Sequence, residues 1–251
     1  MTKNIILFTF LVITGFLGII NYANAETEVS GNISSDITWT LENSPYVIND
    51  TVQVLSNITL TIQPGVIVNL NGGATLAIDG KLVAIGTTNQ KINFIGGTIF
   101  FNDGSVDANV DTNNNYISGS IIQNSIIESS TGIALRIVKS NPFIANNIIR
   151  HAGSYAIHLD HSDSLIINNL INNNTDTALN IYFSNAKILN NNITNNSVAL
   201  KISGGSPLVK QNLIKDNHTG FYILFYSDPE ITHNNIINNT DSNVWMAQDS
   251  D

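Results

Sequence analysis

Residues 147–171 read NIIRHAGSYAIHLDHSDSLIINNLI, a stretch that opens and closes on an Asn followed by two aliphatic residues. A similar pattern recurs every 20–23 residues through the C-terminal half of the chain, with a weaker copy at Ser125. Self-similarity at one period indicates a solenoid, because a single short unit cannot bury its apolar face without its neighbours. The recurring asparagines are Asn147, Asn169, Asn192, Asn212 and Asn235.

Within each unit, aliphatic residues alternate with a more variable column, as where Ile157 and Leu159 flank His158. A β-strand sends alternate side chains to opposite faces, so the aliphatic columns are expected to point inward and the variable column toward solvent. No stretch after the N-terminal segment shows a sustained helical period. We therefore predict an all-β solenoid, a single-stranded parallel β-helix with coils of about 22 residues.

The repeated asparagines have a structural explanation. Asn tolerates the left-handed backbone of a sharp bend better than other non-glycine residues. Its amide also carries both a donor and an acceptor, so stacked copies about 4.8 Å apart can bond from coil to coil. We predict that the five asparagines form such a ladder. The alternative is an ice- or sugar-binding amide array, which would require these side chains to face water.

Composition restricts the partners of the chain. It has 251 residues, no cysteine, and 10 Lys and Arg against 19 Asp and Glu, for a formal net charge of −9. This balance argues against nucleic acid and anionic membranes as partners, since both attract basic patches. Disulfides are excluded, so the stability must come from the repeat core.

The N-terminus has the features of an export signal, with Lys3, an apolar run at residues 5–20, and Ala23-Asn24-Ala25. We expect residues 1–25 to be a signal peptide cleaved near Ala25, and the protein to be secreted, periplasmic or at the cell surface. The alternative is an uncleaved anchor, for which the run is shorter than the roughly 20 residues required. We divide the rest into a cap with the first coils, the repeats, and a polar tail, at residues 26–100, 101–240 and 241–251.

Four short motifs carry a family resemblance. They are SPYV at 44–47, LTIQPGV at 60–66, GKLVAIGT at 80–87 and PxIxNNxI at 142–149. They resemble segments of the secreted right-handed parallel β-helix proteins of the pectin-lyase-like superfamily. The resemblance implies a right-handed coil. It does not imply one activity, because the superfamily includes lyases, hydrolases, epimerases, adhesins and non-enzymes.

No complete catalytic set is present. Asn174-Thr175-Asp176 matches the N-T-D motif of similar galacturonan hydrolases, but their D-D, G-H-G and R-x-K motifs are absent, and hydrolysis needs paired carboxylates. Leu159-Asp160-His161 is similar to a strand of pectate lyases, but after residue 25 Arg occurs only as Arg136 and Arg150, outside the lyase context. We assign no catalytic residue and keep lyase or epimerase chemistry as the alternative function.

Metal ligands are also sparse. Asp107, Asn109 and Asp111 have the spacing of a calcium loop, but Thr112 and Ser118 stand where the loop needs Gly and Glu. The five histidines show no spacing tied to Cys or Glu, and soft ligands are scarce. We therefore expect no metal site and no cofactor. A NosD-like periplasmic accessory role in metal maturation, which the superfamily resemblance suggests, is the second alternative.

The best binding candidate is an outward surface on neighbouring coils. Aromatic faces flanked by amide and acid groups suit sugar rings. We expect a non-enzymatic protein that binds polysaccharide or a cell-surface glycan, or serves a structural role at the surface, with end-to-end self-association through its open coil edges. The candidate ligand-binding residues are His158, Asp160, Asn180, Tyr182, Phe183, Phe225 and Tyr226.

Overall fold

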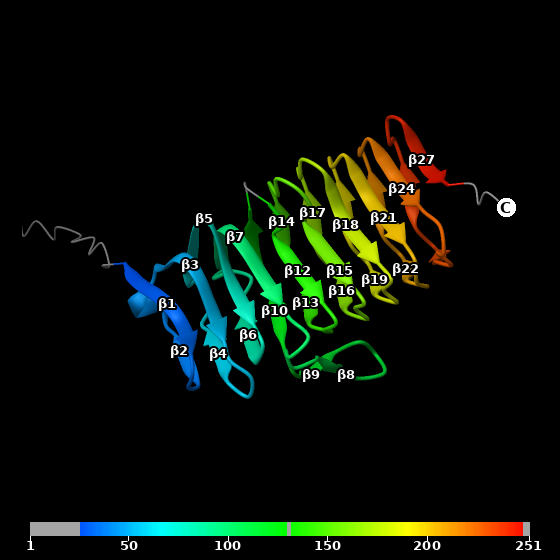
Figure 1. Ribbon diagram of the computed structural model, residues 1–251. Helices are drawn as coiled ribbons and strands as arrows, with labels where there is room; N and C mark the ends of the chain where they lie inside the picture. Colours follow the sequence, from blue (N-terminus) through cyan, green and yellow to red (C-terminus); the bar gives the residue numbers. More distant parts are fainter. Residues whose placement is uncertain (1–25, 130–131, 248–251) are drawn as a thin grey trace, which may run out of the picture.

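The computed structural model describes residues 26–129 and 132–247, which form one parallel β-solenoid (Figure 1). The expected signal peptide at residues 1–25 lies outside the described residues. Apart from one short 3-10 helix, η1 (Leu41–Asn43), the regular elements of the described part are all strands. The prediction of an all-β solenoid with coils about 22 residues apart is confirmed. Among the described residues no helix is long and apolar enough to cross a membrane.

Each coil contributes one short strand to a nine-stranded parallel sheet. Its strands lie one above the next along the axis, and the rest of each coil forms the crossover that joins one strand to the next. In order they are β2 (Ile37–Trp39), β4 (Thr59–Ile62), β6 (Lys81–Ile85), β10 (Ile121–Gln123), β13 (Phe143–Ala145), β16 (Leu165–Ile167), β19 (Lys187–Leu189), β22 (Leu208–Lys210) and β25 (Glu230–Thr232).

The rest of each coil belongs to a sixteen-stranded sheet with two arms. It begins with the long strands β1 (Thr27–Ile33), β3 (Tyr46–Val54), β5 (Ile67–Ile78) and β7 (Ile92–Phe101). After β7 the sheet divides. The first arm contains β11 (Ser125–Glu128), β14 (Ile148–Arg150), β17 (Leu170–Asn172), β20 (Asn192–Thr194), β23 (Leu213–Lys215) and β26 (Asn235–Ile237). The second arm contains β12 (Leu135–Val138), β15 (Ile157–Asp160), β18 (Thr177–Tyr182), β21 (Val198–Ser203), β24 (Thr219–Ile223) and β27 (Ser242–Met246).

The register stacks equivalent residues. Ile157 pairs with Leu179, and Leu179 pairs with Leu200. All three are fully buried, so the aliphatic columns fill the shaft as the alternation predicts. Burying each such side chain contributes about 1.5–3 kcal/mol, so the stacked apolar columns together are a major source of stability in a chain without disulfides.

Three corners of the coil follow one rule: an exposed residue with a left-handed backbone precedes a buried polar residue. At the first corner Asn168 has φ 57°, and Asn169 behind it is 2 % exposed. The Asn147 backbone N–H donates to the Asn169 side chain, and the Asn169 backbone N–H donates to the Asn191 side chain. This ladder runs through Asn147, Asn169, Asn191, Asn212 and Asn234.

Two of the predicted ladder positions are therefore wrong. Asn192 and Asn235 are exposed and lie one residue beyond the ladder, at the first positions of β20 and β26. Asn192 is in register with Leu170 and Leu213, which continue the strand. The sequence pattern predicts that one asparagine adopts the left-handed bend and also makes the ladder hydrogen bonds. In the structure the bend lies at one residue, and the next residue makes the ladder hydrogen bonds. Because the ladder side chains of Asn147 and Asn169 are at most 2 % exposed, they form no surface amide array.

A second asparagine ladder follows the first arm and was not predicted. The Ala152 backbone N–H donates to the Asn174 side chain at 2.9 Å, and Asn174 in turn donates to Asn196. The ladder continues through Asn217 to Asn239. At the third corner serines take this place, because the Ser162 backbone N–H donates to the Ser184 hydroxyl.

Residues outside the repeat depart from the expected organisation at two places. The polar insertion of residues 102–116 carries an antiparallel hairpin, β8 (Asn109–Val110) and β9 (Tyr116–Ser118), which extends beside the coils of β13 and β16 (Figure 1). The segment expected to be a polar tail, residues 241–251, contains β27, which pairs with β24 as one more rung.

Candidate functional site

The outer face of the second arm carries a continuous row of polar and aromatic residues. Strand pairing places Arg136, His158, Asn180, Lys201 and Tyr222 in consecutive coils. The Arg136 guanidinium lies 4.6 Å from the ring centroid of Phe100 and the Lys201 ammonium 6.0 Å from that of Tyr222. A cation therefore lies against an aromatic ring at each end of this row.

His158 and Asn180 form the polar centre of the row. The Asn180 side-chain nitrogen lies 2.8 Å from His158 Nδ1, and Asn180 is only 8 % exposed. Burial lowers the pKa of His158 below its ordinary value of 6.5, and Arg136 acts in the same direction while Asp160 opposes it. The neutral imidazole is thus the form that this face accommodates.

We expect the free energy of unfolding to fall as the pH drops from 7 toward 5. Because the folded-state pKa of His158 is depressed, the unfolded chain binds the proton first below about pH 6.5, so acid favours unfolding. His158→Gln should flatten this pH dependence in urea titrations. His218→Gln at an exposed site is the control, and an unchanged slope in His158→Gln would contradict the assignment.

An aromatic cluster continues from the end of β15 and β18. The Phe183 ring stacks on the His161 ring at 5.6 Å, and Tyr182 meets Phe183 edge-on at 4.6 Å. His161 Nδ1 lies 2.6 Å from a carboxylate oxygen of Asp160. Tyr182 and Phe183 are each 41 % exposed, so their rings are open to a ligand on one side. The structure thus brings together three of the predicted residues, Asp160, Tyr182 and Phe183, with His161, which was not among them.

Phe183 occupies a strained position. Its φ of 41° is left-handed, which is a genuine outlier for an aromatic residue. The same corner carries Lys139, His161 and Gly204 in neighbouring coils. A Cβ at Gly204 would stand 2.6 Å from the Phe183 ring, so glycine in the next coil makes room for it. Such strain costs of order 1–3 kcal/mol and persists mainly at functional sites.

Phe225 and Tyr226 do not join this cluster. Tyr226 is 86 % exposed, and no ring pair among the described residues links either side chain to Tyr182 or Phe183. Instead Tyr222 stacks on Trp245 at 4.3 Å, an aromatic pair that was missed. Lys201 pairs with Tyr222, only 21 residues on, so a fixed step of 22 leads to the wrong residue.

The candidate catalytic and metal motifs have structural roles. Asn174 of the N-T-D tripeptide belongs to the second ladder. The Asp107 carboxylate accepts from Asn141, and the Asp111 carboxylate accepts from Asn113 and Asn115. Across residues 26–129 and 132–247 no group of three or more His, Cys, Asp or Glu could hold a metal ion.

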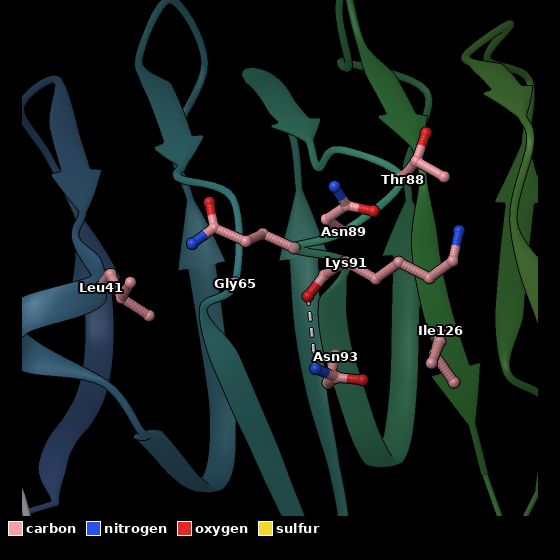
Figure 2. Close-up of a pocket in the computed structure, with 8 residues that line it drawn as sticks. Leu41, Gly65, Thr88, Asn89, Lys91, Asn93 and Ile126 are labelled. Atoms are coloured by element: carbon pink, nitrogen blue, oxygen red, sulfur yellow. Dashed lines mark hydrogen bonds between the residues drawn. The ribbon is translucent and has the colours of Figure 1, made fainter.

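Besides the space under the β8–β9 hairpin, two hollows lie outside the aromatic cluster. One of about 200 Å³ adjoins the row at Arg136 and Phe100. The other, of about 490 Å³, lies over β7 and β11 between Leu41 and Ile126 (Figure 2). Figure 2 shows Lys91 and Asn93 in its lining, where the Asn93 amide donates to the Lys91 carbonyl at 3.3 Å. It is wide and shallow, and we assign no ligand to it.

Comparison with known proteins gives one match. The family model described as "Periplasmic copper-binding protein (NosD)" matches residues 57–250. No curated protein and no solved structure matches the chain. The match covers most of the chain and its parallel β-helix, and its description agrees with the expected export. The chain therefore belongs to the NosD family of periplasmic copper-binding proteins.

Proposed function

We propose that the protein is an exported, non-enzymatic β-helix protein that binds polysaccharide on the outer face of its second arm. The observation that supports this most directly is the exposed cluster of His161, Tyr182 and Phe183 beside the Asp160 carboxylate. The rings offer apolar faces to the C–H face of a sugar, and the acid and imidazole offer hydrogen bonds to its hydroxyls.

The scaffold suits an extended ligand. Coils repeat about every 4.8 Å, so the row places a polar side chain at each step along the axis, with His158 and Lys201 partly exposed on either side of the buried Asn180. The two aliphatic columns on either side of this row, which include Ile157 and Leu159, are buried and anchor the strands in the core. A chain molecule lying along this face would meet several groups without ordering any loop, which limits the entropic cost of binding.

The strained backbone of Phe183 provides separate support. Asn, His or Gly would occupy this corner with less strain, and the other coils carry Lys139, His161, Gly204 and Tyr226 there. An aromatic residue held in this conformation, with Gly204 leaving space beside it, is explained if the ring contacts a ligand.

The proposal predicts that Tyr182→Ala weakens glycan binding by about tenfold or more, since one lost aromatic contact corresponds to roughly that ratio. The first measurement is a glycan array with the mature protein, followed by titration calorimetry on the best ligand. Tyr226→Ala is the matched control, because it removes the same ring from a more exposed site outside the cluster. Equal losses in both variants, or no glycan bound by the parent protein, would contradict the proposal.

Copper is the ligand that the family description names, and the donor set does not fit a resident copper site. In residues 26–129 and 132–247 no three or more His, Cys, Asp or Glu side chains come together where a metal ion could be held. The sequence has no cysteine, and its two methionines are Met1 and Met246. We therefore derive no step through copper. A copper titration of the same protein distinguishes the two functions: tight stoichiometric binding lost in His161→Ala would favour the accessory role in metal maturation.

A further inference from the structure

The β8–β9 hairpin is attached rigidly to the solenoid. At its base the Asp107 carboxylate accepts from the Asn141 backbone N–H at 2.7 Å and from the Asn141 amide at 2.8 Å. The Ala108 backbone N–H donates to the Asn141 carbonyl at 2.8 Å. The Asn141 side chain accepts in turn from the Asp163 backbone N–H of the next coil. The hairpin thus continues a polar column of the solenoid.

The tip of the hairpin is closed by one carboxylate. Asp111 accepts from the backbone N–H groups of Asn113 and Asn115, both at 2.8 Å, and from the Asn115 amide at 2.9 Å. These bonds, that of the Asn115 side chain first, hold the pKa of Asp111 below its ordinary value of 3.8. The Tyr116 ring packs 5.7 Å from the Phe143 ring, which fixes the hairpin over the nine-stranded sheet.

A cleft of about 440 Å³ lies between this hairpin and the sheet. The volume is within the range of small-molecule sites. Its floor is apolar where it meets the sheet, and its walls are rich in amides from the hairpin tip and from the exposed corner residues of two coils. The lining comprises Asn113, Asn114, Asn115, Tyr116, Gln123, Phe143, Ala145, Asn146, Ile167 and Asn168.

The corner amides are not part of the structural ladders. Asn146 and Asn168 have φ 56° and 57° and are exposed, while their successors Asn147 and Asn169 make the ladder bonds. The side chains of Asn146 and Asn168 have no hydrogen-bond partner within the described part of the chain. An amide can both donate and accept, so these groups can satisfy hydroxyls in either role.

We propose that this cleft is a second binding site that takes a neutral oligosaccharide. An apolar floor with amides around it matches a pyranose ring, which has C–H faces and a rim of hydroxyls. The lining contains no Lys, Arg or His, so a carboxylate on the ligand would lose its water without gaining a cation. The cleft therefore differs in ligand class from the second-arm row, which includes Arg136 and Lys201.

The test is titration calorimetry of the mature protein with neutral tetrasaccharides of glucose or xylose, against tetragalacturonate. The double variant N146G/N168G removes both amides and keeps a residue that accepts the left-handed backbone. We expect saturable binding of at least one neutral ligand, weakened about tenfold in this variant. Asn190→Gly, the same corner one coil beyond the cleft, is the matched control and should change affinity less than twofold.

Three results would overturn the proposal: no saturable binding of any neutral tetrasaccharide, equal weakening by Asn190→Gly, or tetragalacturonate binding as tightly as the neutral ligands. Tyr182→Ala should leave binding in the cleft unchanged. Failure of the cleft proposal can therefore be distinguished from failure of the proposed glycan binding on the second arm. Thermal unfolding of the variants shows whether weaker binding comes from the lost amide groups or from a less stable fold.

Discussion

Asn191→Ala is expected to lower the free energy of unfolding by about 3 kcal/mol or more. The Asn191 side chain accepts from the Asn169 backbone N–H at 2.9 Å and donates to the Ile166 carbonyl at 2.9 Å. It also donates to Asn212 at 3.1 Å. Truncation leaves buried polar groups on two adjacent coils without partners, and each such group costs about 1–3 kcal/mol.

The neighbouring residue supplies the control. Asn192→Ala removes the same atoms from an exposed strand position and should change stability by less than about 0.5 kcal/mol. Urea denaturation of the two variants and the parent measures both effects. If Asn192→Ala were the more destabilising change, the ladder would run through the position first expected from the sequence, and the register described here would be wrong.

The period of the solenoid could be predicted from sequence because every coil repeats the same burial. Which asparagine of each coil belongs to the ladder could not be predicted, because Asn191 and Asn192 are adjacent and both match an asparagine column. Regularity was the available signal: the ladder through Asn169, Asn191 and Asn212 steps by 22 and 21 residues, as strand pairing does. The second ladder was missed because its residues Asn174, Asn196 and Asn217 are not followed by the aliphatic pair that marks the repeat.

Which residues lie on the candidate surface of the second arm could be predicted from the sequence, but which of their side chains touch could be predicted only in part. Tyr182 and Phe183 come from one coil, and His161 precedes them by one period, so regular stacking brings them together. Tyr226 stands at the same left-handed corner as Phe183 but two coils further on, with Gly204 in the coil between, so the rings of Phe225 and Tyr226 do not reach the cluster. The cleft under the hairpin depends on a single non-periodic insertion that folds back over the sheet, and no repeat pattern indicates where such an insertion will lie.

Gly97→Ala is the second change with a large expected effect, a loss of about 3 kcal/mol in the free energy of unfolding. Gly97 lies in β7 where the chain passes from the first arm to the second. A Cβ there would stand 1.9 Å from the Ala74 carbonyl oxygen and 2.7 Å from the Leu70 Cβ. The oxygen belongs to the backbone of the preceding coil, so relief requires two coils to separate and weakens their shared sheet.

Gly72→Ala in the preceding coil separates crowding from backbone strain. Gly72 has φ 60° and nothing within 4 Å of an added Cβ, so only the left-handed conformation is penalised, by about 1–2 kcal/mol. Thermal and urea unfolding should therefore rank Gly97→Ala below Gly72→Ala, and Gly72→Ala below the parent. The reverse order would show that the early coils are spaced more widely than described. The long strands β5 and β7 would then not stack closely enough to start the shaft on which the later coils and both binding faces are built.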